Sequence, residues 1–162
     1  MYCLNTCIAH QVIKMHQSAV ILLLVLCASL STDAQPADVR QRYEKFLRQH
    51  VYGKMNERIC DSEIRKRQIT LSDTDNGCKE VNTFIQANGN TVRAVCTGGG
   101  TIYNKQRNLY ISNNPFPVIT CKLTGGTRRP NCVYRGHKST RKIVVACEQG
   151  WPTHYDEGIL NN

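Results

Sequence analysis

The sequence predicts an α+β fold, and three observations support this assignment. The N-terminal half of the chain after residue 37 carries apolar residues at spacings of three and four, which is typical of amphipathic helices. The C-terminal half carries short β-branched segments separated by Gly, Pro and Asn, which is typical of strands. Cysteines are spread through both halves. Helices followed by antiparallel strands indicate an α+β domain.

Three helices are predicted. The first runs from Asp38 to His50, and its apolar face is formed by Tyr43, Phe46, Leu47, His50 and Val51. The second runs from about Asn56 to Lys66, with its basic residues toward solvent. A third, shorter helix is expected after Lys79, over Val81 to Gln86. His50 thus shares the face that the first helix buries, where a histidine is often only a packing residue.

Five strands are predicted in the C-terminal half, because short runs rich in β-branched residues alternate there with turn residues. They span residues 91–97, 108–113, 118–124, 132–135 and 141–148. No repeat and no internal linker interrupts them, so one domain is expected.

The first 34 residues have the pattern of a secretory signal peptide. Lys14 precedes an apolar run from Ala19 to Leu30, which is too short to span a bilayer and ends in small and polar residues. Cleavage after Ala34 would leave residues 35–162 as the mature domain. Translation from Met15 is an alternative that gives the same mature chain.

The cysteines that remain after this cleavage number six of the nine in the chain, and they fit an oxidising compartment. They are Cys60, Cys78, Cys96, Cys121, Cys132 and Cys147. The sequence alone does not choose among their pairings. A zinc site is the alternative, but no Cys-x-x-Cys pair occurs in the mature chain.

The formal net charge is +9, and the predicted signal peptide removes one lysine and one aspartate, so it stays at +9 in the mature domain. A polyanionic partner is expected. Nucleic acid, cell-surface glycosaminoglycan and anionic bacterial membranes all satisfy this charge. Charge alone does not separate them.

Three short motifs together suggest phosphoryl-transfer chemistry without a metal or cofactor. His50 ends Phe-Leu-Arg-Gln-His, Lys79 stands in Cys-Lys-Glu-Val-Asn-Thr-Phe, and His154 stands in Trp-Pro-Thr-His-Tyr-Asp. Cleavage of RNA through its own 2′-hydroxyl needs a base, an acid and a fixed cation. Two histidines and a lysine meet these needs.

These motifs, in this order, resemble the signature of the pancreatic ribonuclease (ribonuclease A) family. The resemblance implies three helices on a bent antiparallel β-sheet and disulfides that join Cys60 to Cys121, Cys78 to Cys132, and Cys96 to Cys147. The loop 98–107 lacks the cysteine of a fourth disulfide, and the stretches 108–112, 120–126 and 147–154 look like angiogenin. The chain therefore resembles the angiogenin branch of the family.

The resemblance also implies roles for individual residues. His50 would be the general base, His154 the general acid, and Lys79 the cation for the transition state. The implied substrate-binding residues are Lys45, Gln49, Val81, Asn82, Thr83, Tyr155 and Asp156. Thr83 would read a pyrimidine edge between walls formed by Val81 and Tyr155, and Asp156 would accept a hydrogen bond from His154.

Two further features follow from the comparison with angiogenin. Glu157 replaces a glutamine that reaches into the pyrimidine pocket, so its carboxylate is expected to bond Thr83 and slow turnover. Arg65, Lys66 and Arg67 lie where angiogenin carries a nuclear-targeting cluster, although such a run is also typical of a solvated helix end.

The sequence therefore predicts a secreted, monomeric endoribonuclease that cleaves RNA 3′ of pyrimidines through a 2′,3′-cyclic phosphate. Low turnover, angiogenic or antibacterial roles and uptake into the nucleus or nucleolus of target cells are expected. The alternative is a cationic effector on the same fold, which binds a receptor or disrupts membranes without catalysis.

Overall fold

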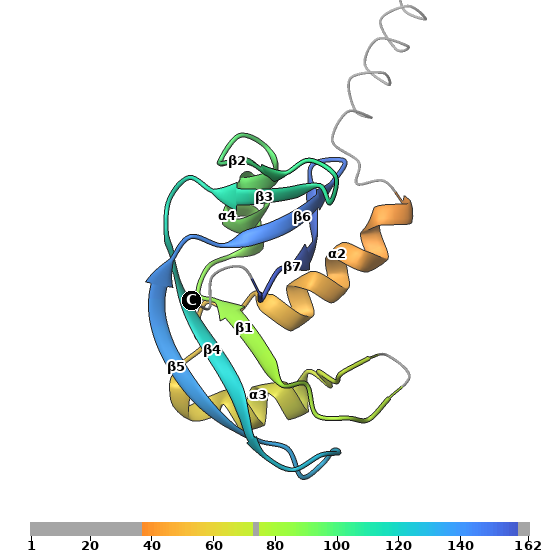
Figure 1. Cartoon of the computed structure of the whole chain (residues 1–162), viewed down its shortest axis with the longest axis vertical. Coiled ribbons are helices and arrows are strands. Elements are labelled where there is room, and N and C mark those ends of the chain that lie inside the picture. The colour runs from red at the N-terminus through yellow and green to blue at the C-terminus, as the bar shows by residue number, and fades with distance from the viewer. Residues whose placement is uncertain (1–36, 73–74, 159–162) are drawn as a thin grey trace, which may run out of the picture. The chain divides into compact units, whose positions relative to one another are not determined.

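The computed structural model describes residues 37–72 and 75–158 (Figure 1). The helical elements are α2 (Ala37–His50), η1 (Glu57–Ile59), α3 (Cys60–Lys66), α4 (Gly89–Arg93) and η2 (Ala94–Cys96). The strands are β1 (Val81–Ile85), β2 (Gly100–Asn104), β3 (Leu109–Ser112), β4 (Phe116–Gly125), β5 (Val133–Arg141), β6 (Val144–Glu148) and β7 (Trp151–Tyr155). The predicted signal peptide, residues 1–34, lies outside the described residues.

The strands form two antiparallel sheets, one with the order β1-β4-β5 and one with the order β2-β3-β6-β7. Figure 1 shows β4 and β5 of the first sheet as long curved strands in the lower part of the domain, with the shorter β1 beside β4, and the second sheet above them, with α2 beside β7. The first sheet contributes to two apolar cores. Val118 of β4 packs in one with Phe46 of α2 and Val145 of β6, and Phe84 and Ile119 of β1 and β4 lie in the other. The α+β class is confirmed.

Helix α2 buries the face that its sequence spacing predicts. Val39, Tyr43, Phe46 and His50 are its buried residues, at intervals of four, three and four. Just beyond the helix, Val51 forms a parallel bridge with Ile85, and the Tyr52 amide donates to the Ile85 carbonyl at 3.0 Å. These contacts hold the end of α2 against β1, so His50 lies beside that strand.

Three disulfides tie the elements together with the pairing that the resemblance implied. Cys60 in α3 bonds Cys121 in β4, Cys78 bonds Cys132, and Cys96 in η2 bonds Cys147 in β6. In the chain-entropy model, loops of this length each contribute on the order of 4 kcal/mol. Cys78 adjoins Lys79, so its disulfide also anchors the segment that carries this lysine.

Two of the predicted elements are wrong. Val81–Ile85 is the strand β1 and not a helix. Its side chains are buried on both faces, so the segment lacks the alternation that identifies a strand in a sequence. Residues 91–96 of the strand predicted at 91–97 fall in α4 and η2, and Thr97 follows η2. The Asn88 side chain accepts from the Thr91 amide at 2.9 Å, and this cap starts a helix that outweighs the β-branched composition.

The other predictions differ from the structure in their bounds or omit elements. The second helix begins as the 3-10 turn η1 and continues as α3, and the strand predicted at 132–135 extends to Arg141. The sequence did not predict β2 or β7. Pro152 interrupts the strand signal in β7, and a proline is tolerated there because β7 lies at the edge of its sheet.

Candidate active site

His50 is held in one orientation by its surroundings. Its side chain is 3% exposed, stacks on the Tyr155 ring with centroids 5.2 Å apart, and packs against Phe46. Its Nδ1 lies 2.9 Å from the Thr83 carbonyl oxygen, which only accepts hydrogen bonds, so Nδ1 carries a proton. Nε2 of the neutral ring is therefore the nitrogen that can accept a proton.

Burial lowers the pKa of His50 well below its ordinary value, and the positive charge of Lys79 lowers it further. The hydrogen bond to Thr83 opposes this shift, and His154 adds a smaller lowering effect. His50 is consequently neutral at physiological pH, which is the state that a general base requires.

Lys79 lies directly ahead of β1 and is tied to α2 through one side chain. Its Nζ donates to Asn82 Oδ1 at 2.8 Å, and Asn82 Nδ2 donates to the Gln49 carbonyl at 2.9 Å. Asn82 is fully buried, so it orients Lys79 and the end of α2 and does not face solvent. Burial lowers the pKa of Lys79, while Glu157 raises it.

His154 approaches from the second sheet. It lies in β7, where it pairs with Ala146 of β6, and its side chain is exposed. Partial desolvation lowers its pKa, Asp156 opposes this, and the cations Lys79 and Arg107 lower it again. The exposed position leaves its ring accessible to a leaving group.

Asp156 has other partners than the one expected. Its Oδ2 accepts from Arg107 Nη2 at 2.9 Å and its Oδ1 accepts from the Gly158 amide at 3.2 Å. The predicted hydrogen bond from His154 is absent from those of the described residues. Arg107, from the segment between β2 and β3, takes this carboxylate instead.

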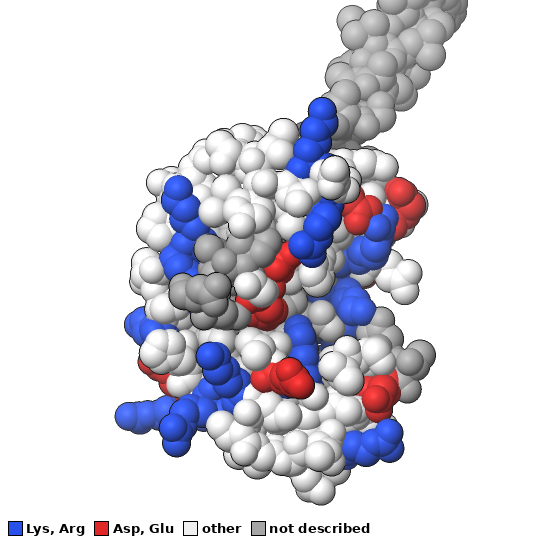
Figure 2. Space-filling view, viewed as in Figure 1, with Lys and Arg blue, Asp and Glu red and all other residues white. Residues whose placement is uncertain are grey.

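The three predicted catalytic residues line a single cavity of about 340 Å³. Its lining comprises Arg42, Lys45, Phe46, Gln49, His50, Thr70, Leu71, Ser72, Lys79, Thr153 and His154. Figure 2 shows basic side chains in the indentation between α2 and the lower part of the domain. Arg42 was not predicted as a site residue, although its spacing from Lys45 and Gln49 places it on the same face of α2.

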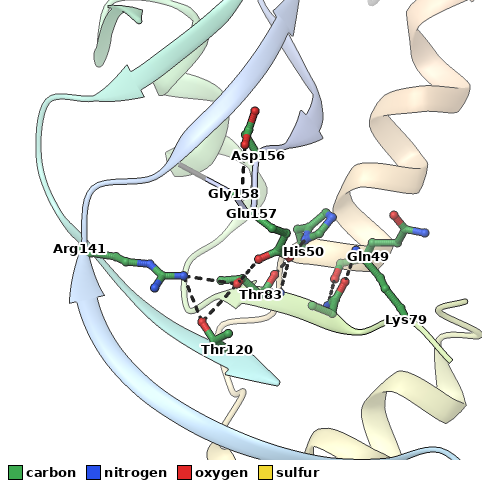
Figure 3. Close-up of polar contacts among 10 residues, drawn as sticks. Gln49, His50, Lys79, Thr83, Thr120, Arg141, Asp156, Glu157 and Gly158 are labelled. Carbon is green, nitrogen blue, oxygen red and sulfur yellow. Dashed lines mark hydrogen bonds and ion pairs between the residues drawn. The ribbon is translucent and has the colours of Figure 1, made fainter. Parts of the chain in front are cut away.

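Thr83, which the sequence predicts to read a pyrimidine edge, is bound by Glu157 (Figure 3). The Thr83 amide donates to Glu157 Oε1 at 2.7 Å, and the Thr83 hydroxyl donates to Oε2 at 2.5 Å. The same carboxylate lies 4.0 Å from His50 Nδ1. Both donors that Thr83 could offer to a base are therefore used within the chain.

The back of Thr83 contacts two further side chains. Its hydroxyl lies 3.2 Å from the Thr120 hydroxyl, and Arg141 Nη2 donates to Thr120 Oγ1 at 3.1 Å. Thr83 and Thr120 are buried in neighbouring strands, β1 and β4. Arg141 ends β5, the third strand of this sheet.

A model of the family described as pancreatic ribonuclease matches residues 41–156, which include both histidines and the lysine of this cavity. The chain belongs to the pancreatic ribonuclease family. Ribonuclease-like 3 of zebrafish is 63% identical over 145 residues, which cover 90% of this chain and 97% of that protein. Angiogenin-4 of the mouse is 42% identical over 143 residues, covering 86% and 94% respectively.

Solved structures of this family have the same fold. The X-ray structure of zebrafish RNase5 superposes with a TM-score of 0.73 at 55% identity and covers 77% of this chain and 100% of that one. RNASE ZF-3E superposes with a TM-score of 0.70 at 62% identity, covering 75% and 98%. The ribonuclease A-like fold and the resemblance to angiogenins are confirmed.

The predicted nuclear-targeting cluster is not uniform in this ribonuclease fold. Arg65 and Lys66 are exposed, but Arg67 Nε binds Glu63 Oε2 at 2.8 Å and its guanidinium lies 4.4 Å from the Tyr52 ring centre. Arg67 Nη1 also donates to the carbonyls of Arg48 and Val51. Arg67 therefore ties α3 to the end of α2.

Beside this cluster lies a second cavity of about 430 Å³ with a predominantly basic lining. It is formed by Arg48, Lys66, Arg67, Gln68, Thr70, Asp75, Asn76 and Arg129. Thr70 lines both cavities, so the basic surface continues from the cavity of His50, Lys79 and His154 to the cluster.

No three His, Cys, Asp or Glu side chains of the described residues lie close enough to hold a metal ion. Within the same residues, no helix is long and apolar enough to cross a membrane.

Proposed function

We propose that this protein is a secreted endoribonuclease that cleaves RNA on the 3′ side of pyrimidines and leaves a 2′,3′-cyclic phosphate. The observation that carries this proposal is the cavity in which His50, Lys79 and His154 meet. The two histidines come from different layers of the fold, so they can flank a phosphodiester placed between α2 and β7.

Each group has one role in the reaction. His50 Nε2 takes the proton of the 2′-hydroxyl, while the Thr83 carbonyl holds Nδ1. Lys79 stabilises the charge that grows on the phosphoryl oxygens. His154 gives a proton to the departing 5′-oxygen. Lys45, Gln49 and Arg42 line the same cavity and would bind phosphate oxygens.

The pyrimidine would lie against Tyr155 and Val81, with its polar edge on the Thr83 amide and hydroxyl. Glu157 holds both of these groups in the free protein, so the substrate must displace it. Each 1.4 kcal/mol of this displacement costs about tenfold in apparent affinity or rate. Slow turnover is therefore part of the proposal.

Product analysis on defined RNA tests the proposal directly. The protein is incubated with an oligonucleotide that holds one pyrimidine among purines, in the presence of a chelator. We expect a single cut 3′ of the pyrimidine and a 2′,3′-cyclic phosphate end. Cuts at purines, a dependence on divalent ions or a product without the cyclic phosphate would contradict the mechanism.

A second function is favoured by the basic cavity beside α3. Four cations line it, and the net charge is +9. This surface would bind a sulfated glycosaminoglycan or an anionic bacterial membrane, in keeping with angiogenic or antibacterial roles and with uptake into the nucleus of target cells. The protein would act as a monomer in each of these roles.

Two variants separate the second function from catalysis. His154→Ala should bind heparin and kill bacteria as well as wild type, whereas the double change Arg65→Gln and Lys66→Gln should weaken both and any nuclear accumulation. Salt should weaken binding too, because exposed charges are screened. Loss of killing in His154→Ala would instead make the effect depend on RNA cleavage.

A further inference from the structure

One large apolar side chain lies exposed in the candidate active-site cavity. Of the described residues, the exposed large hydrophobic ones are Leu71, Ile102, Tyr103 and Val133. Leu71 is the most exposed of the four, at 61%, and it alone of them lines this cavity. An apolar group among cations does not bind phosphate, so its place in the cavity points to a different part of the ligand.

The backbone of Leu71 is held in place although its side chain is exposed. Its amide donates to the Gly77 carbonyl at 3.0 Å, and the Thr70 hydroxyl donates to the Ser72 carbonyl at 2.7 Å. Two positions earlier, Ile69 is 1% exposed and anchors the segment in an apolar core. A side chain on a fixed backbone loses little further freedom when a ligand packs against it.

Leu71 lies where the candidate active-site cavity meets the second cavity beside α3. Its neighbour Thr70 lines both cavities. Lys79 supplies positive charge in the first cavity, and Arg48 and Lys66 supply it in the second. Because phosphates bind where cations gather, an RNA strand with phosphates in both cavities would pass over Leu71.

The polyanions that fit this charge differ in their apolar surface. RNA carries flat base faces between its phosphates, which pack on apolar and aromatic side chains. A sulfated glycan presents hydroxyl and sulfate groups instead. Cations attract both polymers, whereas burial of Leu71 is favourable only against a base. The side chain thus supplies a selectivity that charge lacks.

The orientation of His50 indicates which part of the strand reaches Leu71. Nδ1 of His50 faces the Thr83 carbonyl, on the side where the pyrimidine would bind, and Thr83 does not line the cavity. The nucleotides after the cut therefore extend through the cavity. The first of them lies beside His154, which gives a proton to its 5′-oxygen, so Leu71, next to the second cavity, meets a base further along.

Resting on the ribonuclease function proposed above, we propose that Leu71 is a further substrate-binding residue. It packs against a base on the 3′ side of the cut, beyond the two nucleotides that flank the cut, and so makes this basic surface select RNA over sulfated glycan. The contact also makes RNA that is extended on its 3′ side a better substrate than a dinucleotide.

Initial rates on three substrates test this contact. They are cytidylyl-adenosine, the same dinucleotide extended by adenosines on its 3′ side, and the same dinucleotide extended by adenosines on its 5′ side. Leu71→Ser should lower kcat/KM on the 3′-extended RNA by about fivefold, in keeping with the loss of one base contact, and should leave the other two rates unchanged. An equal loss on all three substrates, or no loss on the 3′-extended RNA, would overturn the proposal.

Ile102→Ser is the matched control, because Ile102 is 60% exposed and lies outside the cavity lining. It should leave all three rates unchanged. Leu71→Phe should raise kcat/KM on the 3′-extended RNA by about threefold, since a planar ring stacks on a base. Thermal unfolding checks that each variant is folded. If Leu71→Ser does not fold, the Leu71→Phe rate decides: a gain supports the proposal, and an unchanged or lower rate overturns it.

Binding to a DNA oligonucleotide and to heparin, measured by fluorescence anisotropy, does not require catalysis, because DNA lacks the 2′-hydroxyl. Leu71→Ser should weaken binding of the oligonucleotide by about fivefold and leave heparin binding unchanged. Equal weakening of both would overturn the proposal. If wild type does not cut RNA, the ribonuclease function fails, while the ratio of oligonucleotide to heparin binding still decides the role of Leu71.

Discussion

The two parts of the proposed site, called here the phosphate side and the base side, differ in how ready they are for a ligand. On the phosphate side, His50, Lys79 and His154 line a basic cavity of about 340 Å³. The Thr83 carbonyl and the Asn82 side chain hold His50 and Lys79 in place. On the base side, the chain's own Glu157 binds both donors of Thr83. The proposed catalytic groups are thus in place, while recognition of a base at Thr83 would require a contact within the chain to break.

Loss of the phosphate side should produce the largest effect. We expect His50→Ala and His154→Ala each to reduce kcat/KM by about 10²- to 10⁴-fold, because each removes a proton-transfer group. Lys79→Ala should cost about 10²- to 10³-fold by removing charge stabilisation. Initial rates on a dinucleotide measure these losses.

Lys54→Ala is the control for lost charge, because Lys54 is exposed and outside the cavity lining. It should retain wild-type rates. Near-normal rates in either histidine variant would place the acid–base groups elsewhere.

The next largest effect is expected on stability, from Arg67, which holds the end of α2 that carries His50. Arg67 binds Glu63 and the carbonyls of Arg48 and Val51, which flank His50 in the chain. Arg67→Ala should therefore lower the free energy of unfolding by about 2 kcal/mol, in the range for hydrogen bonds to charged groups. Denaturant unfolding measures this loss.

Arg65→Ala is the matched variant, since Arg65 is an exposed neighbour in the same basic cluster. Its free energy of unfolding should change by less than about 0.5 kcal/mol. Equal effects of the two changes would show that Arg67 is a solvated cation like Arg65 and has no structural role.

The smallest effect concerns the border between the two sides, where Arg107 holds Asp156. In a bell-shaped pH profile of kcat/KM, activity rises as His50 loses its proton and falls as His154 loses its own. The pKa values of both are lowered, so both limbs should lie on the acid side of the ordinary histidine range of about 6.5.

Arg107→Ala removes a cation that lowers the pKa of His154 and frees Asp156, which raises it. The alkaline limb should therefore move to higher pH while the acid limb, set by His50, stays in place. A shift of both limbs, or of neither, would contradict the assignment of His154 as the acid.

The helical spacing was sufficient to predict that His50 lies on a buried face, because Phe46 and Tyr43 repeat at helical intervals. The motifs and their resemblance to a known family predicted the disulfides, and they predicted as catalytic three residues that the fold brings to one cavity. The strand β1 was missed because its buried side chains do not alternate, and α4 because one asparagine cap outweighs a β-branched composition. In both segments one local sequence signal opposes another, and composition alone does not decide between helix and strand.

The interactions of the base side could not be predicted in this way. Thr83, Thr120 and Arg141 lie on three strands, and they meet only through the pairing of β1 with β4 and β4 with β5. Likewise, the Asp156 carboxylate binds Arg107 from a segment 49 residues away, which no motif contains. Side-chain contacts that depend on strand pairing between distant segments cannot be predicted from residue spacing or from motifs.

The most direct test of the account is the rate of dinucleotide cleavage by Glu157→Ala. Removal of the carboxylate frees both Thr83 donors and leaves the side chains of His50, Lys79 and His154 in the cavity, so kcat/KM should rise, by about tenfold for each 1.4 kcal/mol that the contact contributes. Glu80→Ala, which removes an exposed carboxylate near Lys79, is the control and should cause a smaller change. Unchanged or slower cleavage by Glu157→Ala would contradict the account, because the base side would then be open in the wild-type protein.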